Sequence, residues 1–460
     1  MSRVGLARAA AAMSVLAAVL AGCAPSSKIT EDQSCRTAVY RLGDGRVIDI
    51  APSQDGDLRW RMDDGRSGRL SVKHQWASTL GWTGQPDGVS VGLPPCGGDQ
   101  IRFTDKGQPP IFGERVRLQS RETTFKSGNV TLFGRLVTPP GDGPIPIVVD
   151  VHGSEKDAAT VFYYDQRMLP AQGVGVFVYD KRGTGRSTGK YTQDFQTLAR
   201  DAAAAVVEAR RLAGGRVQRI GFQGGSQGGW IAPLAATLTP VDFVIVGYGL
   251  AGSPGEENTD QTVLELKRKG YGPADLAGAA EVARATNAVV GSHFQSGYQG
   301  LDQARARYGA RPWFKQLNGQ FTGQVLKYPD WVLRILGPIL DVGTPIDYDA
   351  VSVLKRVKAP MLWVLADDDT MAPNAETRRR LAALVAHGAN ITVLGFPNTD
   401  HDIMEFITTP GGEREETRYA DGYFRTTVDW AKTGGLHMPY GRAVLVSQRE
   451  APPPEISLPR

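Results

Sequence analysis

The stretch Gly224-Gly225-Ser226-Gln227-Gly228-Gly229 decides the fold of this chain. It contains the pattern Gly-x-Ser-x-Gly, and it stands between a β-rich run, Val217–Phe222, and a helical run that begins at Gln227. A strand that passes at once into a helix leaves room only for a tight turn with small neighbours, which presents the serine hydroxyl at the strand's carboxyl end. Taken alone, the pattern also fits a glycine-rich structural turn, so a role for Ser226 as nucleophile depends on the surrounding sequence.

Strands and helices alternate on both sides of this turn. Ile145–Val151 is a nearly continuous β-branched run, as expected for a strand that is buried on both faces. Apolar residues from Phe195 to Leu212 recur at helical spacing and stop before Gly214-Gly215. The other expected core elements are strands at Val130–Val137, Gly173–Tyr179, Phe243–Val246, Met361–Leu365 and Ile391–Phe396 and helices at Ala375–Ala386 and Tyr419–Ala431. The alternation predicts an α/β fold with a doubly wound, mostly parallel sheet.

Two segments depart from the alternation. Short alternating runs separated by pairs such as Asp44-Gly45 and Asp64-Gly65 predict a small antiparallel β domain before the core. Helix-like runs with many aromatic residues after residue 250 predict a helical cap inserted into the core. The expected segments are a signal peptide at 1–22, a tether at 23–33, the β domain at 34–119, the core at 120–249 and 346–440, the cap at 250–345 and a loosely held tail at 441–460.

The N-terminus has the features of an export signal. Arg3 and Arg8 precede an apolar run, Ala9–Leu20, which is too short to be a comfortable membrane span. The run ends in Leu20-Ala21-Gly22-Cys23, which resembles a bacterial lipobox, and that resemblance implies that Cys23 is acylated and becomes the mature N-terminus. We therefore expect a lipid-anchored protein of the bacterial cell envelope that faces the periplasm or the exterior. A plain secretory signal with an incidental cysteine is the alternative.

Composition and charge exclude several classes of function. The 460 residues are 41% hydrophobic and 22% charged, which is ordinary for a globular protein. The formal charge falls from +4 to +2 when residues 1–22 are removed, so nucleic acid is not expected as a partner. Zinc is not expected, because no CxxC or HxxxH spacing occurs. If Cys23 carries lipid, Cys35 and Cys96 remain, and in an exported chain they are expected to form a disulfide rather than stay as two buried thiols.

The partners that a serine nucleophile needs are present downstream. A base that works near neutral pH must be a histidine, and His401 lies in a loop directly after a late core strand. Asp367, Asp368 and Asp369 follow another core strand, and all three carboxylates cannot point at one imidazole. The backbone N–H of Gln227, at the start of a helix, is expected to stabilise an oxyanion. The N–H of Ser154, in the loop after the first core strand, is the second expected donor.

The region from about residue 120 to 432 resembles bacterial α/β hydrolases of the capped esterase and serine aminopeptidase-like type. The motifs that carry the resemblance are Val151-His152-Gly153-Ser154, Tyr179-Asp180-Lys181-Arg182-Gly183-Thr184-Gly185-Arg186-Ser187, Gly224–Gly229, and the Asp and His loops. The resemblance implies that Asp369, four residues before Pro373, is the triad acid, with Asp367 as the alternative. It implies that Asp180 and Arg182 are structural. Gly225, where the family commonly has His, and Ala366, where it usually has Gly, are departures.

The chemistry implied is acyl transfer, for which no metal or organic cofactor is expected. Ser226 would attack a carbonyl, His401 would take its proton, and water would resolve the acyl-enzyme. A small-molecule or short-chain carboxylic ester is the first expected substrate, and a peptide or amide cleaved by the same triad is the second. A peptidase would also need a carboxylate for a substrate ammonium, and Glu256-Glu257 could supply it or belong to a solvated loop. A non-enzymatic envelope lipoprotein with the same fold is a third hypothesis.

Overall fold

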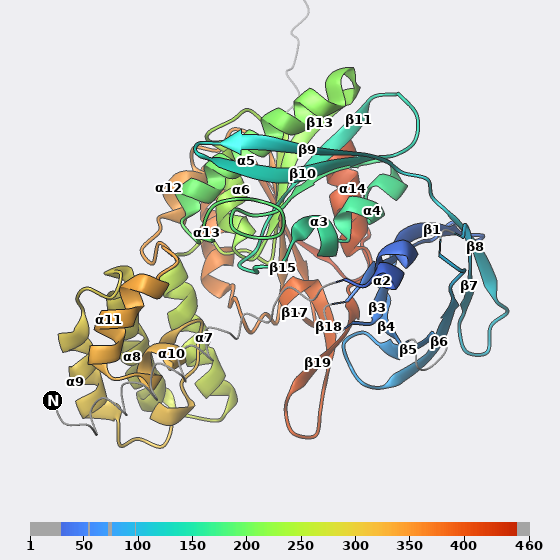
Figure 1. Cartoon of the computed structure of the whole chain (residues 1–460). Coiled ribbons are helices and arrows are strands. Elements are labelled where there is room, and N and C mark those ends of the chain that lie inside the picture. The colour runs from blue at the N-terminus through green and yellow to red at the C-terminus, as the bar shows by residue number, and fades with distance from the viewer. Residues whose placement is uncertain (1–28, 54–55, 72–75, 97, 449–460) are drawn as a thin grey trace, which may run out of the picture.

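The structure, a computed structural model, describes residues 29–53, 56–71, 76–96 and 98–448. These residues form a β barrel, an α/β core and a helical cap, with the barrel and the cap on different sides of the core (Figure 1). The expected signal peptide and Cys23 lie outside the described residues. Within the described part of the chain, no helix combines the length and apolar character needed to cross a bilayer.

The N-terminal domain is an eight-stranded antiparallel barrel. Each strand pairs with the next in the chain, and β1 closes the barrel by pairing with β8. Alternate side chains, among them Tyr40, Trp60 and Phe103, point inward and form its own apolar core. The prediction of a small antiparallel β domain is confirmed. The strands are β1 Ala38–Leu42, β2 Val47–Pro52, β3 Leu58–Met62, β4 Ser67–Ser71, β5 Ala77–Leu80, β6 Pro86–Gly92, β7 Gln100–Thr104 and β8 Ile111–Arg115.

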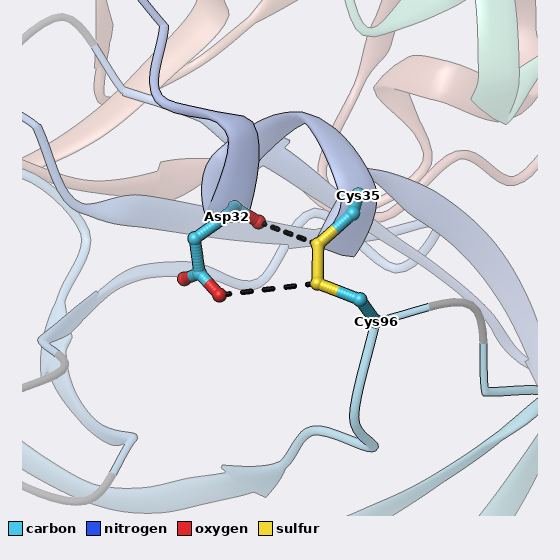
Figure 2. Close-up of side chains that lie close together, drawn as sticks. All are labelled: Asp32, Cys35 and Cys96. Carbon is cyan, nitrogen blue, oxygen red and sulfur yellow. Dashed lines mark hydrogen bonds between the residues drawn. A yellow bond between two sulfur atoms is a disulfide. The ribbon is translucent and has the colours of Figure 1, made fainter.

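A disulfide joins the helix that precedes β1 to the loop that follows β6. Cys35 lies in helix α2, Glu31–Arg36, and its Cα is 5.2 Å from that of Cys96 (Figure 2). The predicted pairing is confirmed. The expected flexible tether at 23–33 is wrong for its last residues. Thr30 caps α2, which begins at Glu31, and Gln33 is buried. The capping bond gives this polar stretch a helical start that its composition alone did not indicate.

Removal of the disulfide should destabilise the barrel. The two cysteines are 61 residues apart, and a cross-link over a loop of that length contributes about 4 kcal/mol by the chain-entropy estimate. We expect the double variant Cys35→Ser, Cys96→Ser to lower the free energy of unfolding of the barrel by about this amount. Urea unfolding followed by near-ultraviolet circular dichroism measures it, and an unchanged midpoint would contradict the expectation.

The core is a nine-stranded sheet in the order β20-β16-β15-β14-β13-β11-β12-β10-β9. In this order, each pair of neighbouring strands from β16 to β12 is parallel. β20 at one edge and β10 and β9 at the other are antiparallel to their neighbours. The prediction of a doubly wound, mostly parallel sheet is confirmed. The strands are β9 Gln119–Ser127, β10 Val130–Thr138, β11 Ile145–Val151, β12 Gly175–Tyr179, β13 Val217–Gly225, β14 Phe243–Gly247, β15 Met361–Ala366, β16 Ile391–Phe396 and β20 Val444–Gln448.

Helices cover both faces of the sheet. Neighbouring residues of β11 point to opposite faces, so that Ile147 and Val149 belong to one apolar core and Val148 to the other. On the first face lie α5 Phe195–Ala213, α6 Gly228–Ala236, α12 Ala350–Leu354 and α13 Ala375–Ala386; on the second lie α3 Ala159–Phe162, α4 Asp165–Met168 and α14 Tyr423–Thr433. This three-layer arrangement places the carboxyl ends of the parallel strands at one edge of the sheet.

The cap is helical, as predicted, and is inserted between β14 and β15. Its helices pack around two small apolar cores, one around Trp313 and one around Leu301. They are α7 Pro254–Arg268, α8 Pro273–Gly291, α9 Tyr298–Tyr308, α10 Thr322–Lys327 and α11 Asp330–Leu340. A capping box in which Ser253 and Glu256 bond to each other's backbone N–H starts α7 where the chain leaves the core.

The C-terminal part of the core differs from expectation in two places. The predicted helix Tyr419–Ala431 begins only at Tyr423, because residues 404–419 form a hairpin of β18 Met404–Thr408 and β19 Arg414–Tyr419 that continues from β17 Thr399–Asp400. The expected loose tail at 441–460 is wrong for its first part, since β20 adds an antiparallel strand to the edge of β16. β19 is polar and lacks the apolar alternation that identifies a strand in the sequence. β20 begins with the apolar residues Val444-Leu445-Val446, but it is exposed, and its pairing with β16 joins segments that are distant in the chain.

The hairpin links the core to the barrel. The Tyr419 N–H donates to the Gly65 carbonyl at 2.9 Å, and the Trp82 N–H donates to the Glu416 carbonyl at 2.9 Å. An ion pair between Asp49 of the barrel and Arg167 of α4 adds a second contact. Because the hairpin follows His401 directly in the chain, the barrel supports the segment that carries this histidine.

Candidate active site

Ser226 lies at a strained turn between β13 and α6. Its φ of 52° falls in the left-handed region that non-glycine residues seldom adopt. A Cβ on Gly224 would approach the carbonyl oxygen of Gly228 to 2.4 Å, so only glycine allows the strand and the helix to come this close. The structure therefore contains the tight strand-to-helix turn that the Gly-x-Ser-x-Gly pattern predicts. Ser226 lines a cavity.

His401 is held by Asp369. The Nδ1 atom of His401 lies 2.8 Å from Oδ2 of Asp369, and both side chains are buried. The other oxygen of Asp369 accepts the N–H groups of Met371 at 3.0 Å and Ala372 at 2.7 Å, which fixes the carboxylate. Asp367 is instead bound by Arg378. Of the two aspartates that the sequence left open, the structure brings Asp369 to the imidazole.

The charges around His401 favour its protonated form. Burial acts to lower the pKa of His401, but the charge and hydrogen bond of Asp369, together with the charges of Asp402 and Glu257, outweigh it and raise this pKa to about 9. The pKa of Glu257 is raised to about 8, mainly by burial. The charge of His401 lowers this pKa, and the charge of Asp369 raises it. The pKa values of both His401 and Glu257, which line the same cavity, are therefore raised above their ordinary values.

The two expected oxyanion donors border the same cavity. Gln227 is the N-cap residue of α6 and Ser154 follows β11, and both line the cavity together with Ser226. Among the described residues, neither backbone N–H has a hydrogen-bond acceptor. Free N–H groups at a helix start and in the adjoining loop are suited to a developing negative charge.

The loop of Ser154 is fixed by the second sequence motif. Lys181 donates through Nζ to the carbonyl oxygens of Gly153 at 2.5 Å and Glu155 at 3.0 Å. The Tyr191 hydroxyl donates to the Ser154 carbonyl at 2.6 Å. The motif therefore acts on the site through the loop, while its Arg182 is engaged by Asp201 in an ion pair.

The cavity lies between the core and the cap and has a volume of about 560 Å³. Ser226 and His401 stand on its core side, and Glu257 of α7 on its cap side. Most of the remaining lining is apolar and comes from the cap: Val290, Phe294, Phe321, Val325, Tyr328, Val332, Leu333, Leu336 and Leu340. A substrate with an apolar group on one side of its carbonyl would fill this space.

Tyr248 is a site residue that sequence reasoning missed. Its ring meets that of His401 edge to face, with centroids 4.8 Å apart. Burial and the charge of Asp402 raise the pKa of Tyr248 well above its ordinary value. A Cβ on Gly225 would lie 2.3 Å from the Tyr248 hydroxyl oxygen. This explains the departure at Gly225: the tyrosine occupies the space that a side chain there would need. No motif in the sequence marks Tyr248, since it reaches the site from the end of β14.

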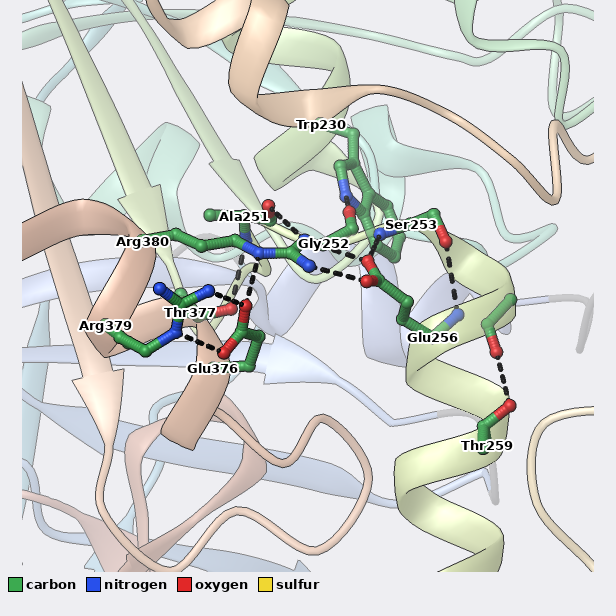
Figure 3. Close-up of polar contacts among 11 residues, drawn as sticks. Trp230, Ala251, Gly252, Ser253, Glu256, Thr259, Glu376, Thr377, Arg379 and Arg380 are labelled. Carbon is green, nitrogen blue, oxygen red and sulfur yellow. Dashed lines mark hydrogen bonds and ion pairs between the residues drawn. The ribbon is translucent and has the colours of Figure 1, made fainter. Parts of the chain in front are cut away.

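The carboxylates at 256 and 257 separate in the fold. Glu256 binds Arg380 of α13 and caps α7, so its charge is compensated outside the cavity (Figure 3). Glu257 is the one that lines the cavity. The sequence did not distinguish them, because adjacent helical residues face about 100° apart and only the packing of α7 decides which points inward.

One segment of the core matches a known protein family. Residues 143–251, which include the loop of Ser154 and the turn of Ser226, match the family described as serine aminopeptidase, S33. No match was found among curated proteins. Similar solved structures include an esterase from Pyrococcus furiosus (14% identity, 62% of this chain and 84% of that chain, TM-score 0.39). Others are a Pyrococcus horikoshii acylaminoacyl peptidase (14%, 87% and 58%, 0.42) and a Mycobacterium smegmatis proline iminopeptidase (20%, 61% and 91%, 0.36).

Proposed function

We propose that this chain, which has the α/β-hydrolase fold and a central segment of the serine aminopeptidase type, is a serine hydrolase that cleaves carboxylic esters. The observation that carries the proposal is the meeting of Ser226 with the His401–Asp369 pair at one apolar cavity. A serine needs a base, an oriented imidazole and oxyanion donors to act as a nucleophile, and the cavity offers candidates for each.

In this mechanism Ser226 attacks the ester carbonyl while His401 takes its proton. Asp369 holds the imidazole in the tautomer that leaves the other ring nitrogen free to accept. The N–H groups of Gln227 and Ser154 stabilise the oxyanion of the tetrahedral intermediate. His401 then protonates the leaving alcohol, and a water molecule, activated by the same histidine, releases the acid and restores Ser226.

The cap residues that line the cavity favour an ester substrate with an apolar acyl or alkyl group. Most of the residues that the cap contributes to the cavity are aliphatic or aromatic, beside the polar Gln320, Gln324, Asp341 and Thr344. The pKa of Glu257, about 8, leaves that carboxyl largely uncharged at neutral pH. A neutral carboxyl can share a wall with an apolar group at much smaller cost than an ionised one.

Peptide or amide cleavage is the second candidate, and Glu257 is the observation that favours it. An ionised Glu257 beside the nucleophile would bind the ammonium group of an aminoacyl substrate. A panel of p-nitrophenyl esters of rising chain length, assayed beside aminoacyl-p-nitroanilides, separates the two. We expect higher kcat/KM on the esters, with an optimum at intermediate chain length. Turnover confined to the anilides, and lost in Glu257→Gln, would assign the peptidase instead.

The pH profile should report the neighbours of His401. The histidine must be uncharged to accept a proton, so kcat/KM should rise with pH through the pKa of about 9. Because the charge of Glu257 raises this pKa, Glu257→Gln should move the acid limb of the profile to lower pH. The matched control is Glu256→Gln, whose carboxylate is bound to Arg380. A limb that stays in place, or moves equally in both variants, would contradict the role given to Glu257.

The location of the protein is proposed from its N-terminus alone. The lipobox-like Leu20-Ala21-Gly22-Cys23 supports acylation of Cys23 and attachment to a bacterial envelope membrane. Metabolic labelling with palmitate should tag the wild type and not Cys23→Ser. Recovery of an untagged wild type in the soluble periplasmic fraction would contradict the anchor.

A further inference from the structure

Helix α11 is apolar on two opposite sides. One side faces the catalytic cavity, where Val332, Leu333 and Leu336 line the wall. The other side faces solvent. Trp331, Ile335 and Ile339 follow each other at four-residue spacing there and form one stripe, with 54%, 59% and 63% of each residue exposed. A surface helix normally turns a polar face to water, and an exposed apolar stripe of this kind marks a contact surface.

The apolar surface continues to the opening of the cavity. Leu340, at the end of α11, and Met371, in the core after β15, both line the cavity and are partly exposed. The side chain of Gln320 bridges cap and core there by donating to the Met371 carbonyl at 3.3 Å. Figure 1 shows α11 on the part of the cap that lies away from the β barrel. A partner bound to this apolar stripe would therefore lie beside the opening of the cavity.

The charges on α11 favour an anionic contact. Its ionisable residues are Asp330 and Arg334. Asp330 is bound by Arg305, so its charge is compensated. The guanidinium of Arg334 lies 3.8 Å from the centroid of the Tyr298 ring and has no carboxylate partner among the described residues. The helix thus presents one tryptophan, two isoleucines and an arginine, the residue types that lie at the boundary of a phospholipid bilayer.

We propose that the outer face of α11, defined as Trp331, Arg334, Ile335 and Ile339, docks onto a membrane surface that contains anionic phospholipid. Docking would place the opening of the cavity beside the lipid phase, from which an apolar ester enters; this second part rests on the proposed function. A second copy of the chain bound to the same face would sit beside Leu340 and Met371 and obstruct the opening. A lipid surface also matches the expected export of the chain as a lipoprotein.

The test uses the chain from Ala24 onward, which retains every described residue and cannot be acylated at Cys23. Flotation with vesicles of phosphatidylethanolamine and phosphatidylglycerol measures binding, and phosphatidylcholine vesicles test the preference for anionic lipid. We expect the wild type to bind and the triple variant Trp331→Ser, Ile335→Ser, Ile339→Ser to partition at least about tenfold less. The matched control is Val207→Ser, Leu238→Ser, since these residues are 63% and 48% exposed on the core.

Three results would overturn the proposal: a wild type that does not float, a triple variant that floats equally well, or light scattering that shows a dimer dissociated by the triple variant. Ser226→Ala should bind vesicles as the wild type does, so loss of hydrolysis and loss of docking are separate outcomes. The triple variant should keep its turnover of soluble p-nitrophenyl acetate, because the three residues lie outside the cavity lining. Its turnover of a long-chain ester carried in the vesicles should fall.

Discussion

Ser226→Ala is expected to lower kcat/KM for ester hydrolysis by about four to six orders of magnitude. In the proposed mechanism the substitution removes the atom that would form the acyl-enzyme, while the apolar cavity and the proposed oxyanion donors remain. The fold should survive, because alanine can keep the backbone of a turn that already holds a residue with a Cβ at a φ of 52°. Initial rates on a short p-nitrophenyl ester, together with a thermal melt, measure both parts.

The matched control for this variant is Ser352→Ala, at an exposed position on α12. A fluorophosphonate probe adds a direct readout, since it labels only an activated serine, and labelling should be lost in Ser226→Ala alone. Ester turnover retained by Ser226→Ala would remove the serine from the mechanism. A wild type that neither labels nor turns over any ester or anilide would favour the non-enzymatic lipoprotein.

Asp369→Asn is expected to lower kcat by about four orders of magnitude, whereas Asp367→Asn should change it little. Only the group bonded to Nδ1 of His401 sets the tautomer of the imidazole, and that group is Asp369, at 2.8 Å. The asparagine can still accept the N–H groups of Met371 and Ala372, so the loop should keep its shape. Asp367 contributes a partly exposed ion pair with Arg378, and such pairs add about 0–1 kcal/mol to stability.

The pH dependence separates a role of Asp369 in orienting His401 from a merely structural one. Its charge is the main influence that raises the pKa of His401, so the residual activity of Asp369→Asn should have its acid limb at lower pH. The limb of Asp367→Asn should coincide with that of the wild type. A reversed ranking of the two variants would transfer the role of triad acid to Asp367.

Local sequence determined the parts of this protein that depend on short-range sterics. The turn of Ser226 could be predicted because glycines at fixed offsets are the only residues that let β13 and α6 approach. The buried strands could be predicted because a strand covered on both faces must be apolar throughout. The pairing of Cys35 with Cys96 could be predicted from the cysteine count and the expected export of the chain, neither of which needs coordinates.

Tertiary structure decided what depends on contacts between distant segments. The choice of Asp369 over Asp367, the inward turn of Glu257 rather than Glu256, and the placement of Tyr248 in the space beside Gly225 all arise from how separate elements pack. The edge strands β9, β19 and β20 also escaped prediction. β9 and β19 are mostly polar and carry no apolar alternation. β20 is a short exposed run whose strand conformation depends on its pairing with β16, a contact between distant segments. Backbone geometry at a turn is set by neighbouring side chains, whereas the partner of a carboxylate is set by the packing of the whole domain.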